Sequence, residues 1–233
     1  MRTAVVIPTF NERDSIKGLV HQIFALGISE LEIIVVDDSS TDGTFELLRI
    51  LKKRFRVTII SRPRKMGLGS ALKDGLSLAL NHGAARVITM DGDGSHSPDS
   101  LPNLLAELDK GAGVAIGSRR VSGGAIYGWG WLRILMSRGA MEVSRRVLKI
   151  SARDVTSGLR AYRRKVLEMI DLTRVASTGY AFQEEMLFRA ERAGFGIVEL
   201  PITFVDRRHG KSKLGIRDIV EFFITVARLK LHA

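Results

Sequence analysis

The 233-residue sequence contains no cysteine, which excludes a disulfide framework. It also lacks an uninterrupted run of about 18 apolar residues, the length that a membrane-spanning helix needs. The best candidate, between Ile126 and Met136, is broken by Arg133. The N-terminus passes from Met1 directly into a strand-like apolar stretch, without the cleavage site of a signal peptide. We therefore expect a cytoplasmic protein that does not cross a membrane.

Aromatic residues make up only 6% of the chain, and acids are fewer than bases, which leaves a formal net charge of +11. The excess is concentrated between Arg119 and Lys165, where twelve Lys or Arg residues stand against Glu142 and Asp154, a net charge of +10. Surfaces that bind nucleic acid often interleave aromatic rings with basic residues, so we expect no nucleic-acid partner. The basic segment favours a lipid phosphate or an anionic membrane face, with a solvated basic surface as the alternative.

Short apolar runs alternate with amphipathic segments through the first 118 residues, which predicts an α/β fold with a mostly parallel sheet and helices on both faces. Beyond them the alternation weakens. Residues 123–131 have the composition of a loop, and 131–148 predict a basic amphipathic helix. The expected strands are 3–7, 31–36, 57–60, 87–90, 113–117 and 196–205, and residues 156–162 are expected to be a loop that leads into another short strand. The other helices are expected within 14–27, 44–54, 65–81, 98–109, 164–170, 182–193 and 215–231.

The strand predicted at 87–90 ends in Asp91-Gly-Asp93. Two carboxylates this close repel each other unless a cation lies between them, and their hard oxygens suit Mg²⁺ or Mn²⁺, particularly when a substrate diphosphate completes the coordination. A solvated turn is the alternative for this motif alone. Because other polar clusters also follow predicted strands, and ligands bind at the carboxyl edge of open parallel sheets, we expect the binding site at that edge.

A dinucleotide-binding fingerprint is not present. The segment that opens the helix near residue 68 has only Gly67 and Gly69 in fitting positions, whereas the fingerprint needs three spaced glycines and an acid about 20 residues later. A nicotinamide-dependent enzyme is therefore not expected.

Nine short motifs follow one another along the chain. They are Pro-Thr-Phe-Asn-Glu at 8–12, Asp-Asp-Ser-Ser-Thr-Asp-Gly-Thr at 37–44, Gly-Leu-Gly-Ser-Ala at 67–71, Met-Asp-Gly-Asp-Gly-Ser-His at 90–96, Gly-Ser-Arg at 117–119, Arg-Ile-Leu-Met-Ser-Arg-Gly at 133–139, Thr-Ser-Gly at 156–158, Gly-Tyr-Ala-Phe-Gln-Glu-Glu at 179–185 and Arg-Arg-His-Gly-Lys-Ser-Lys at 207–213. Together they resemble the family 2 glycosyltransferases of GT-A fold, and within that family the dolichol-phosphate mannose synthases. The resemblance covers residues 3 to 215.

The resemblance implies transfer of mannose from GDP-mannose to dolichyl or another polyprenyl phosphate, with inversion and with a divalent cation, Mg²⁺ or Mn²⁺. On the donor side it assigns the nucleotide pocket to Pro8, Phe10, Glu12, Asp37, Asp38, Asp91, Arg207 and Lys213, and the metal to Asp91, Asp93 and Ser95. One carboxylate of Asp37 and Asp38 is expected to contact the base or ribose. Turn chemistry and capping are the alternative roles for the residues between 8 and 38.

On the acceptor side the resemblance assigns the phosphate to Arg119, Arg133 and Ser137. Arg133 and Ser137 are four residues apart, so a guanidinium and a hydroxyl lie on the same side of the expected helix. The residues expected to carry catalysis are Asp93, Arg119, Arg133 and Lys213, and Gln183 and Glu185 are expected to line the site, with a buried structural glutamate as the alternative.

We expect residues 1–214 to form the GT-A domain and 215–233 a C-terminal amphipathic helix with Ile219, Val220, Phe223, Ile224, Ala227 and Leu231 on one side. Peripheral docking at the cytoplasmic face of an anionic membrane is expected through the basic helix, Trp129, Trp131 and this last helix. Packing of the last helix on the domain or on a partner is the alternative, and a small membrane partner subunit is a further expected contact. The competing functions are a UDP-glucose-dependent transferase, a transferase with a soluble acceptor, and a non-catalytic sugar-nucleotide-binding subunit.

Overall fold

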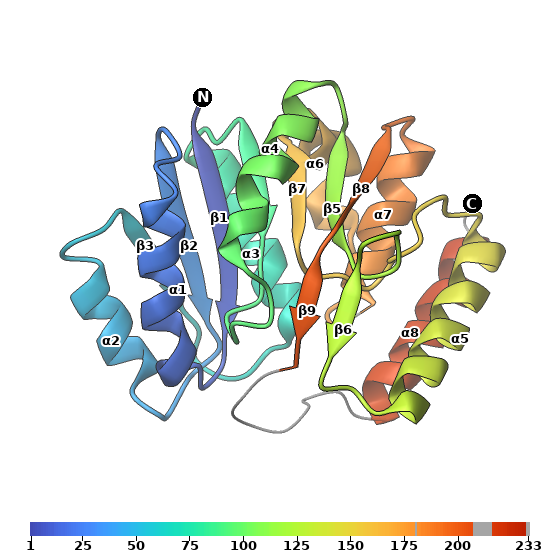
Figure 1. Ribbon diagram of the computed structural model, residues 1–233, viewed down its shortest axis with the longest axis horizontal. Helices are drawn as coiled ribbons and strands as arrows, with labels where there is room; N and C mark the ends of the chain where they lie inside the picture. The colour runs from blue at the N-terminus through green and yellow to red at the C-terminus, as the bar shows by residue number, and fades with distance from the viewer. Residues whose placement is uncertain (180, 207–215, 232–233) are drawn as a thin grey trace.

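A seven-stranded sheet with helices on both faces forms the centre of the computed structural model (Figure 1). The structure describes residues 1–179, 181–206 and 216–231, and the side chains of 216–220 lie outside this description. The sheet order is β3-β2-β1-β4-β7-β5-β8, and only β7 runs antiparallel to its neighbours. The strands are β1 (Thr3–Thr9), β2 (Leu31–Asp37), β3 (Val57–Ser61), β4 (Arg86–Thr89), β5 (Val114–Ser118), β7 (Arg160–Arg163) and β8 (Ile197–Pro201).

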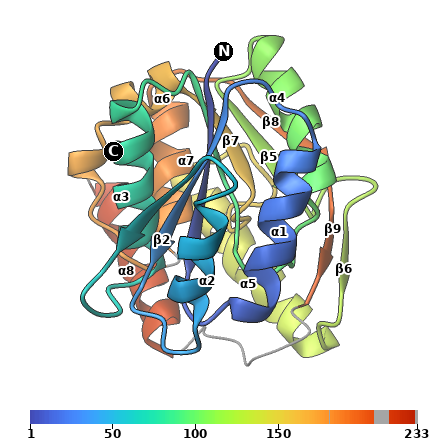
Figure 2. The ribbon, with the colours of Figure 1, turned by 90° about the vertical axis from the view of Figure 1, so that its left-hand side faces the viewer.

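Two hydrophobic cores lie on opposite faces of this sheet (Figure 2). Alternate residues of β1 face the two cores: Ala4 and Val6 face one, and Val5 and Ile7 face the other. The helices are α1 (Arg13–Ala25), α2 (Thr44–Leu51), α3 (Leu68–Asn81), α4 (Leu101–Asp109), α5 (Trp131–Leu148), α6 (Arg164–Ile170), α7 (Phe182–Arg192) and α8 (Ile216–Leu231), with short 3-10 turns at Pro98–Ser100 and Leu172–Arg174. The predicted α/β fold is confirmed, and each predicted helix is found.

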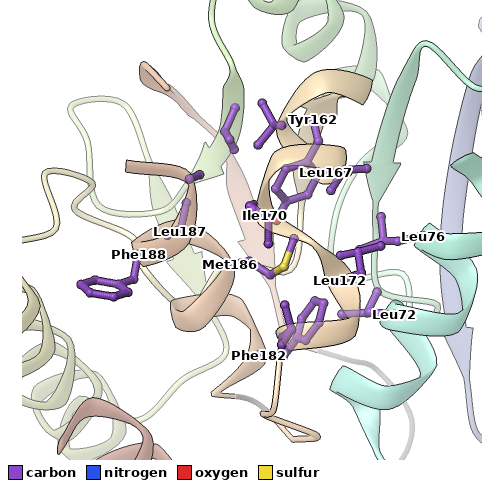
Figure 3. Close-up of a cluster of buried hydrophobic side chains, with 14 of the residues drawn as sticks. Leu72, Leu76, Tyr162, Leu167, Ile170, Leu172, Phe182, Met186, Leu187 and Phe188 are labelled. Carbon is purple, nitrogen blue, oxygen red and sulfur yellow. The ribbon is translucent and has the colours of Figure 1, made fainter. Parts of the chain in front are cut away.

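The core on the α3 face is held by helices from both halves of the chain. Leu72 and Leu76 of α3 lie in one cluster with Leu167 of α6 and with Phe182 and Met186 of α7 (Figure 3). Helix α3 approaches the sheet so closely at Gly75 that a Cβ there would lie 2.3 Å from a methyl carbon of Val6. This packing joins the first part of the chain to the second. The loops that the two parts contribute at the end of the sheet are thereby kept in fixed positions relative to one another.

A second, two-stranded parallel sheet corrects two predictions. Residues 123–131 are predicted to be a loop, but they contain β6 (Ala125–Tyr127), which pairs with β9 (Thr203–Val205). The predicted strand at 196–205 is divided into β8 and β9, and only β8 belongs to the main sheet. The small sheet is stabilised by pairing between segments about 75 residues apart, which local sequence patterns do not reveal. In Figure 1 it lies at the end of the main sheet that carries the candidate site.

Helix α8 lies beside α5 and buries a different side from the one predicted to be apolar (Figure 1). Phe222, Val226 and Leu229 are buried in the core, whereas Phe223 and Ile224 are 45% and 62% exposed. Ile219 and Val220 of the predicted face, and the predicted domain boundary at 214 and 215, lie outside the described side chains and residues. Within the described part of the chain, every helix is too short or too polar to span a bilayer.

Candidate active site

The loops that follow β1, β2, β4 and β5 meet at the carboxyl edge of the main sheet. These strands run in the same direction, because β1 is parallel to β2 and β4, and β7 is antiparallel to both β4 and β5. Their last residues are Thr9, Asp37, Thr89 and Ser118. Thus the predicted site residues between 8 and 119 come from one edge, the edge at which open α/β sheets bind ligands, whereas Arg133 and Ser137 lie on α5.

The loop after β1 is tied to the start of α2. Pro8 lies within β1, and the backbone N–H of Glu12 donates to the Thr44 hydroxyl at 3.0 Å. The ring of Phe10 lies 4.3 Å from the ammonium of Lys65, on the loop between β3 and α3. Phe10 and Glu12 are half-buried, so this loop presents an aromatic ring and a carboxylate at the sheet edge.

Asp37, the last residue of β2, is buried and accepts hydrogen bonds from its own loop. Its Oδ1 accepts from the hydroxyls of Thr9 and Ser40 at 3.0 and 2.6 Å, and its Oδ2 accepts from the Ser40 N–H at 3.0 Å. These are the contacts of turn chemistry, which the sequence left as the alternative role for this residue.

The neighbouring Asp38 holds the loop that precedes α3. Its carboxylate accepts from the backbone N–H of Met66 at 2.9 Å and of Gly67 at 3.0 Å, and it pairs with the buried guanidinium of Arg62 at 3.1 Å. Asp38 is 5% exposed. Contact of Asp37 or Asp38 with a base or ribose stays a prediction.

Asp91 and Asp93 follow β4, and the residues after them orient both carboxylates. Asp93 accepts from the N–H of Ser95 at 3.0 Å, and Asp91 is 3.2 Å from Nε2 of His96. His96 is buried, and the buried hydroxyl of Ser95 has no hydrogen-bond partner among the described residues. An orphaned hydroxyl beside two carboxylates is a set of hard oxygen donors, which fits Mg²⁺ or Mn²⁺.

The described residues hold no group of three or more His, Asp or Glu side chains arranged around one point. The described residues therefore offer two carboxylates and a hydroxyl at this place, fewer donors than the six that Mg²⁺ takes. Substrate phosphate oxygens and water would have to complete such a shell. This donor count suits a metal that binds together with a diphosphate.

The loop between α5 and β7 packs against Asp91 from the other side. A Cβ added at Gly158 would lie 2.8 Å from Oδ1 of Asp91, so a larger residue would displace the carboxylate. The Gly158 carbonyl accepts from the Thr89 hydroxyl at 2.8 Å. Arg160, which is fully buried, donates to the carbonyls of Val155 and Ser157 and fixes the rest of this loop.

Arg119, which follows β5, forms a buried ion pair with Asp154. Its N–H, Nε and Nη2 donate to the carboxylate at 2.9, 2.8 and 2.7 Å, and Nη2 also donates to the Thr156 hydroxyl. Burial opposes the charge of Asp154, but the hydrogen bonds and charge of Arg119 outweigh it, so the pKa of this carboxyl lies below its ordinary value. The charge of Arg119, one of the predicted acceptor-phosphate residues, is thus balanced within the chain.

A continuous set of contacts joins Asp91 to Arg133. His96 lies edge-on to Phe204 of β9, with 5.3 Å between ring centroids, and Phe204 lies edge-on to Trp129 at 5.6 Å. The guanidinium of Arg133 lies 4.0 Å from the Trp129 ring. The small sheet therefore connects the predicted metal ligands with the predicted phosphate-binding arginine. Of the two tryptophans expected at a membrane, Trp129 is half-buried in this cluster.

The predicted acceptor residues on α5 have partners of their own. Arg133 pairs with Asp206 at 3.0 Å, and the Ser137 hydroxyl accepts from Nη2 of Arg120 at 3.2 Å. Burial lowers the pKa of the Arg120 guanidinium, and the like charges of Arg119 and Arg138 lower it further. Arg120 could not be selected from the sequence, because it is one of twelve basic residues in its segment.

Helix α7 carries the two predicted lining residues, Gln183 and Glu185, with a further acid between them. Gln183 is buried, and Glu185 accepts from the Ser177 hydroxyl at 2.6 Å and pairs with Arg189 and Arg228 at 2.8 and 3.0 Å. Burial opposes the charge of Glu185, but these partners outweigh it and lower the pKa of its carboxyl. These contacts match the buried structural glutamate that the sequence left as the alternative.

Glu184, between them, is fully buried and has no hydrogen bond of ordinary geometry in the described part of the chain. The Ser144 hydroxyl and the Arg160 guanidinium lie near it, but burial dominates and raises the pKa of this carboxyl to about 8. Of the other predicted residues, Arg207 and Lys213 lie outside the described residues.

Comparison with known proteins is consistent with this arrangement. The family model for glycosyl transferase family 2 matches residues 4–170. The chain is 43% identical over 228 residues to the polyprenol monophosphomannose synthase of Mycolicibacterium smegmatis, covering 97% of this chain and 86% of that protein. It is 39% identical over 234 residues to the undecaprenyl-phosphate mannosyltransferase of Micrococcus luteus, covering 100% and 96% of the two chains.

The fold matches glucosyl-3-phosphoglycerate synthase from Mycobacterium tuberculosis at 22% identity. The crystal structure with Mn²⁺, uridine diphosphate and phosphoglyceric acid has a TM-score of 0.73 and covers 98% of this chain and 78% of that chain. The crystal structure with Mg²⁺ and uridine diphosphate has a TM-score of 0.70 and covers 99% and 78%. At this identity the likeness shows the GT-A fold alone. Because the family model spans most of the chain and two relatives match along nearly its whole length, this protein belongs to glycosyl transferase family 2.

Proposed function

We propose that this protein transfers a mannosyl residue from GDP-mannose to the phosphate of a polyprenyl lipid such as dolichyl phosphate. The observation that carries the proposal is the set of contacts that runs from Asp91 through His96, Phe204 and Trp129 to Arg133. It supports the proposal because it links a carboxylate suited to a metal-bound diphosphate with a cation suited to a second phosphate. The names of the two full-length relatives, both of which transfer mannose to a polyprenyl carrier, support the same substrates.

The reaction needs positioning more than proton transfer. A phosphate monoester has a second pKa of about 6, so it is largely dianionic at neutral pH and one of its oxygens can attack without a protein base. That oxygen forms a bond to the anomeric carbon of mannose from the face opposite the diphosphate. The bond from this carbon to the diphosphate oxygen breaks, and GDP leaves with the electron pair, so the configuration inverts. Cationic side chains reduce the repulsion between the two phosphate groups.

Asp91 and Asp93 would hold a divalent cation in this scheme, with the Ser95 hydroxyl as a further donor. When bound, such an ion supplies Lewis-acid stabilisation of the charge on the departing diphosphate. His96 fixes the orientation of Asp91, and Gly158 leaves room for it. The protein thereby contributes an oriented pair of carboxylates.

A two-phase transfer assay tests the proposal. Purified protein is incubated with radiolabelled GDP-mannose, a polyprenyl phosphate and Mn²⁺, and label in the organic phase is counted. We expect transfer that EDTA abolishes and that UDP-glucose does not replace as donor. Transfer from UDP-glucose alone would replace the donor assignment. Absence of transfer from either donor, in detergent and in liposomes, would favour a non-catalytic subunit or a requirement for a membrane partner.

We also propose that α5 and α8 bring the active site to an anionic membrane face. Both helices expose large apolar side chains: Trp131, Leu132, Leu135 and Met136 on α5, and Phe223, Ile224 and Leu231 on α8. Arg138, Arg146 and Lys149 on or next to α5 are exposed beside them. Apolar side chains flanked by cations are typical of a helix that lies at a lipid interface. The amount of protein that sediments with vesicles should therefore depend on their content of anionic lipid. Equal binding of the protein to neutral vesicles would contradict docking at an anionic membrane face.

A further inference from the structure

Arg120 and Arg119 are neighbours in sequence but differ in how their charge is balanced. Arg119 donates three hydrogen bonds to Asp154, which is itself fully buried. Arg120 has no acidic partner within ion-pair distance among the described residues, and its Nε is buried without a hydrogen-bond partner there. Arg119 and Arg138 add like charge around it. A half-buried cation in this setting favours an anion from outside the chain.

The Ser137 hydroxyl shows where such an anion would lie. This oxygen accepts from Nη2 of Arg120 at 3.2 Å. A hydroxyl that accepts from a guanidinium still has its own O–H to donate, and no hydrogen bond donated by this hydroxyl is found in the described part of the chain. A phosphate oxygen placed there would receive the hydroxyl proton and lie next to a guanidinium, which makes the interaction charge-assisted.

The surroundings of Ser137 indicate which kind of phosphate fits. Leu135 and Met136, immediately before it on α5, are each 60% exposed. Arg133, one turn earlier, is paired with Asp206. An anion site bordered by exposed apolar side chains suits an amphiphile with a phosphate head and a hydrocarbon tail better than it suits a sugar nucleotide.

We propose that Arg120 is a binding residue for the phosphate of the prenyl-phosphate acceptor, acting together with Ser137. This inference rests on the proposed function for the identity of the acceptor. Arg120 orients the Ser137 hydroxyl so that its proton points to the phosphate, and it supplies positive charge that has no carboxylate within ion-pair distance among the described residues.

The test compares Arg120→Gln with Arg153→Gln, because both remove one positive charge from the same basic segment. Arg153 is exposed on the loop between α5 and β7, its side chain has no hydrogen bond or ion pair in the described residues, and it therefore controls for the general field. We expect Arg120→Gln to raise the KM for polyprenyl phosphate about tenfold or more, the range for loss of one charge-assisted hydrogen bond, with the KM for GDP-mannose unchanged. Arg153→Gln should change the acceptor KM less than about threefold. Equal effects of the two substitutions on the acceptor KM would overturn the proposal.

Two further variants keep the test decisive if Arg120→Gln does not fold. Arg120→Lys keeps the charge but loses the planar fork, so its acceptor KM should lie between those of the parent protein and a charge-free variant. Ser137→Ala should also weaken binding of the acceptor and raise its KM. The variant that carries substitutions at both Arg120 and Ser137 should raise the acceptor KM by less than the product of the two single effects, because both residues act on one phosphate. Fully multiplicative effects would contradict joint binding.

A binding measurement separates this inference from the proposed reaction. Calorimetric titration with geranyl phosphate needs no turnover, and geraniol provides the same tail without the phosphate. Binding of geranyl phosphate that Arg120→Gln weakens, together with absence of transfer, would keep the phosphate site and reject the reaction. Transfer by the parent protein with identical geranyl phosphate binding in both arginine variants would keep the reaction and reject the role of Arg120.

Discussion

The two sides of the candidate site fix their charged groups in different ways. On the donor side, Asp37 and Asp38 accept hydrogen bonds from backbone N–H groups and hydroxyls of loops within about 30 residues of them. On the acceptor side, Arg119 and Arg133 pair with carboxylates 35 and 73 residues away. The donor side is thus built by local turns, whereas the acceptor side depends on contacts between distant parts of the chain.

Backbone N–H groups and hydroxyls hold Asp37 in place without an ion pair among the described residues, whereas Asp38 is also paired with the buried Arg62. An arginine paired with a buried aspartate likewise has its charge matched inside the protein. In the proposed acceptor site, the cations without an internal partner are therefore the ones best suited to a phosphate.

The largest expected effect is on the donor side. Asp91→Asn keeps the size of the side chain but removes the charge that would hold a divalent ion. We expect transfer to fall by a factor on the order of a thousand or more, the scale of losing a Lewis acid at the departing diphosphate. Initial rates at saturating GDP-mannose and Mn²⁺ measure this, and Mn²⁺ binding followed by electron paramagnetic resonance gives a second readout.

Asp99→Asn serves as its control, because Asp99 is a nearby aspartate that accepts from Ser97 in the next turn. It should keep nearly full activity and Mn²⁺ binding. If Asp91→Asn retained the metal signal and most of the rate, the donor-side carboxylate would not be a ligand.

The next effect lies on the acceptor side and concerns stability. Asp154→Asn would leave the Arg119 guanidinium buried without a counter-charge. Breaking a buried pair in this way costs about 3–5 kcal/mol of the free energy of unfolding. Urea unfolding followed by circular dichroism measures it. Glu142→Gln, which removes an exposed partner of Arg145 and Arg146, should cost less than about 1 kcal/mol. Similar losses for the two variants would show that the Asp154 pair is not stabilising.

The same contrast explains how much the sequence could predict. The strands near residues 5, 34, 59, 88 and 115 and the helix at 131–148 follow from local apolar patterns, and all of them are present. The position of Asp91 and Asp93 at the end of a strand followed from the same patterns. A short strand near β7 is also predicted, but its antiparallel placement between β4 and β5, like the pairing of β6 with β9, depends on contacts between distant segments and has no local signal.

Among site residues, Asp154 had the best available signal. It is one of two acids within a strongly basic segment, and an isolated acid in such a segment is a candidate ion-pair partner. The choice of Arg119 as its partner could not be predicted, because twelve basic residues compete for it. The burial of His96 between Asp91 and Phe204 is visible only in three dimensions, because the two partners lie far apart in the sequence.

Glu184 gives an effect of intermediate size that depends on pH. Its folded-state pKa of about 8 lies above the ordinary 4.5, so the folded protein binds this proton more tightly than the unfolded chain does. Its contribution to stability is therefore complete below pH 4.5 and is lost as the pH rises through about 8. The shift sets an upper limit of roughly 4–5 kcal/mol, and we expect roughly half of it, because a buried ion draws in water.

Glu184→Gln removes this titration while keeping the shape of the side chain. The difference in free energy of unfolding between parent and variant, measured at pH 6 and pH 9, should shift in favour of the variant at the higher pH. The groups that face Glu184 are the Ser144 hydroxyl and the Arg160 guanidinium, and neither titrates in this range in the unfolded chain. A difference that does not change with pH would show that Glu184 ionises normally.

The smallest expected effect on stability is on the open surface of the acceptor side. Trp131 is 76% exposed at the start of α5, so Trp131→Ser removes little buried area and should change the free energy of unfolding by less than about 0.5 kcal/mol. If α5 contacts a membrane, the same change should weaken binding to anionic vesicles severalfold, because a tryptophan at a lipid interface loses its apolar contact. Vesicle sedimentation and urea unfolding of the same preparation separate the two results.

The matched control is Ile50→Ser. Ile50 is 56% exposed on α2, a helix in the other half of the chain, so its substitution should leave vesicle binding unchanged. Equal vesicle binding by both variants would place the membrane contact elsewhere, whereas a selective loss for Trp131→Ser would show that the acceptor side keeps its apolar residues exposed for the lipid.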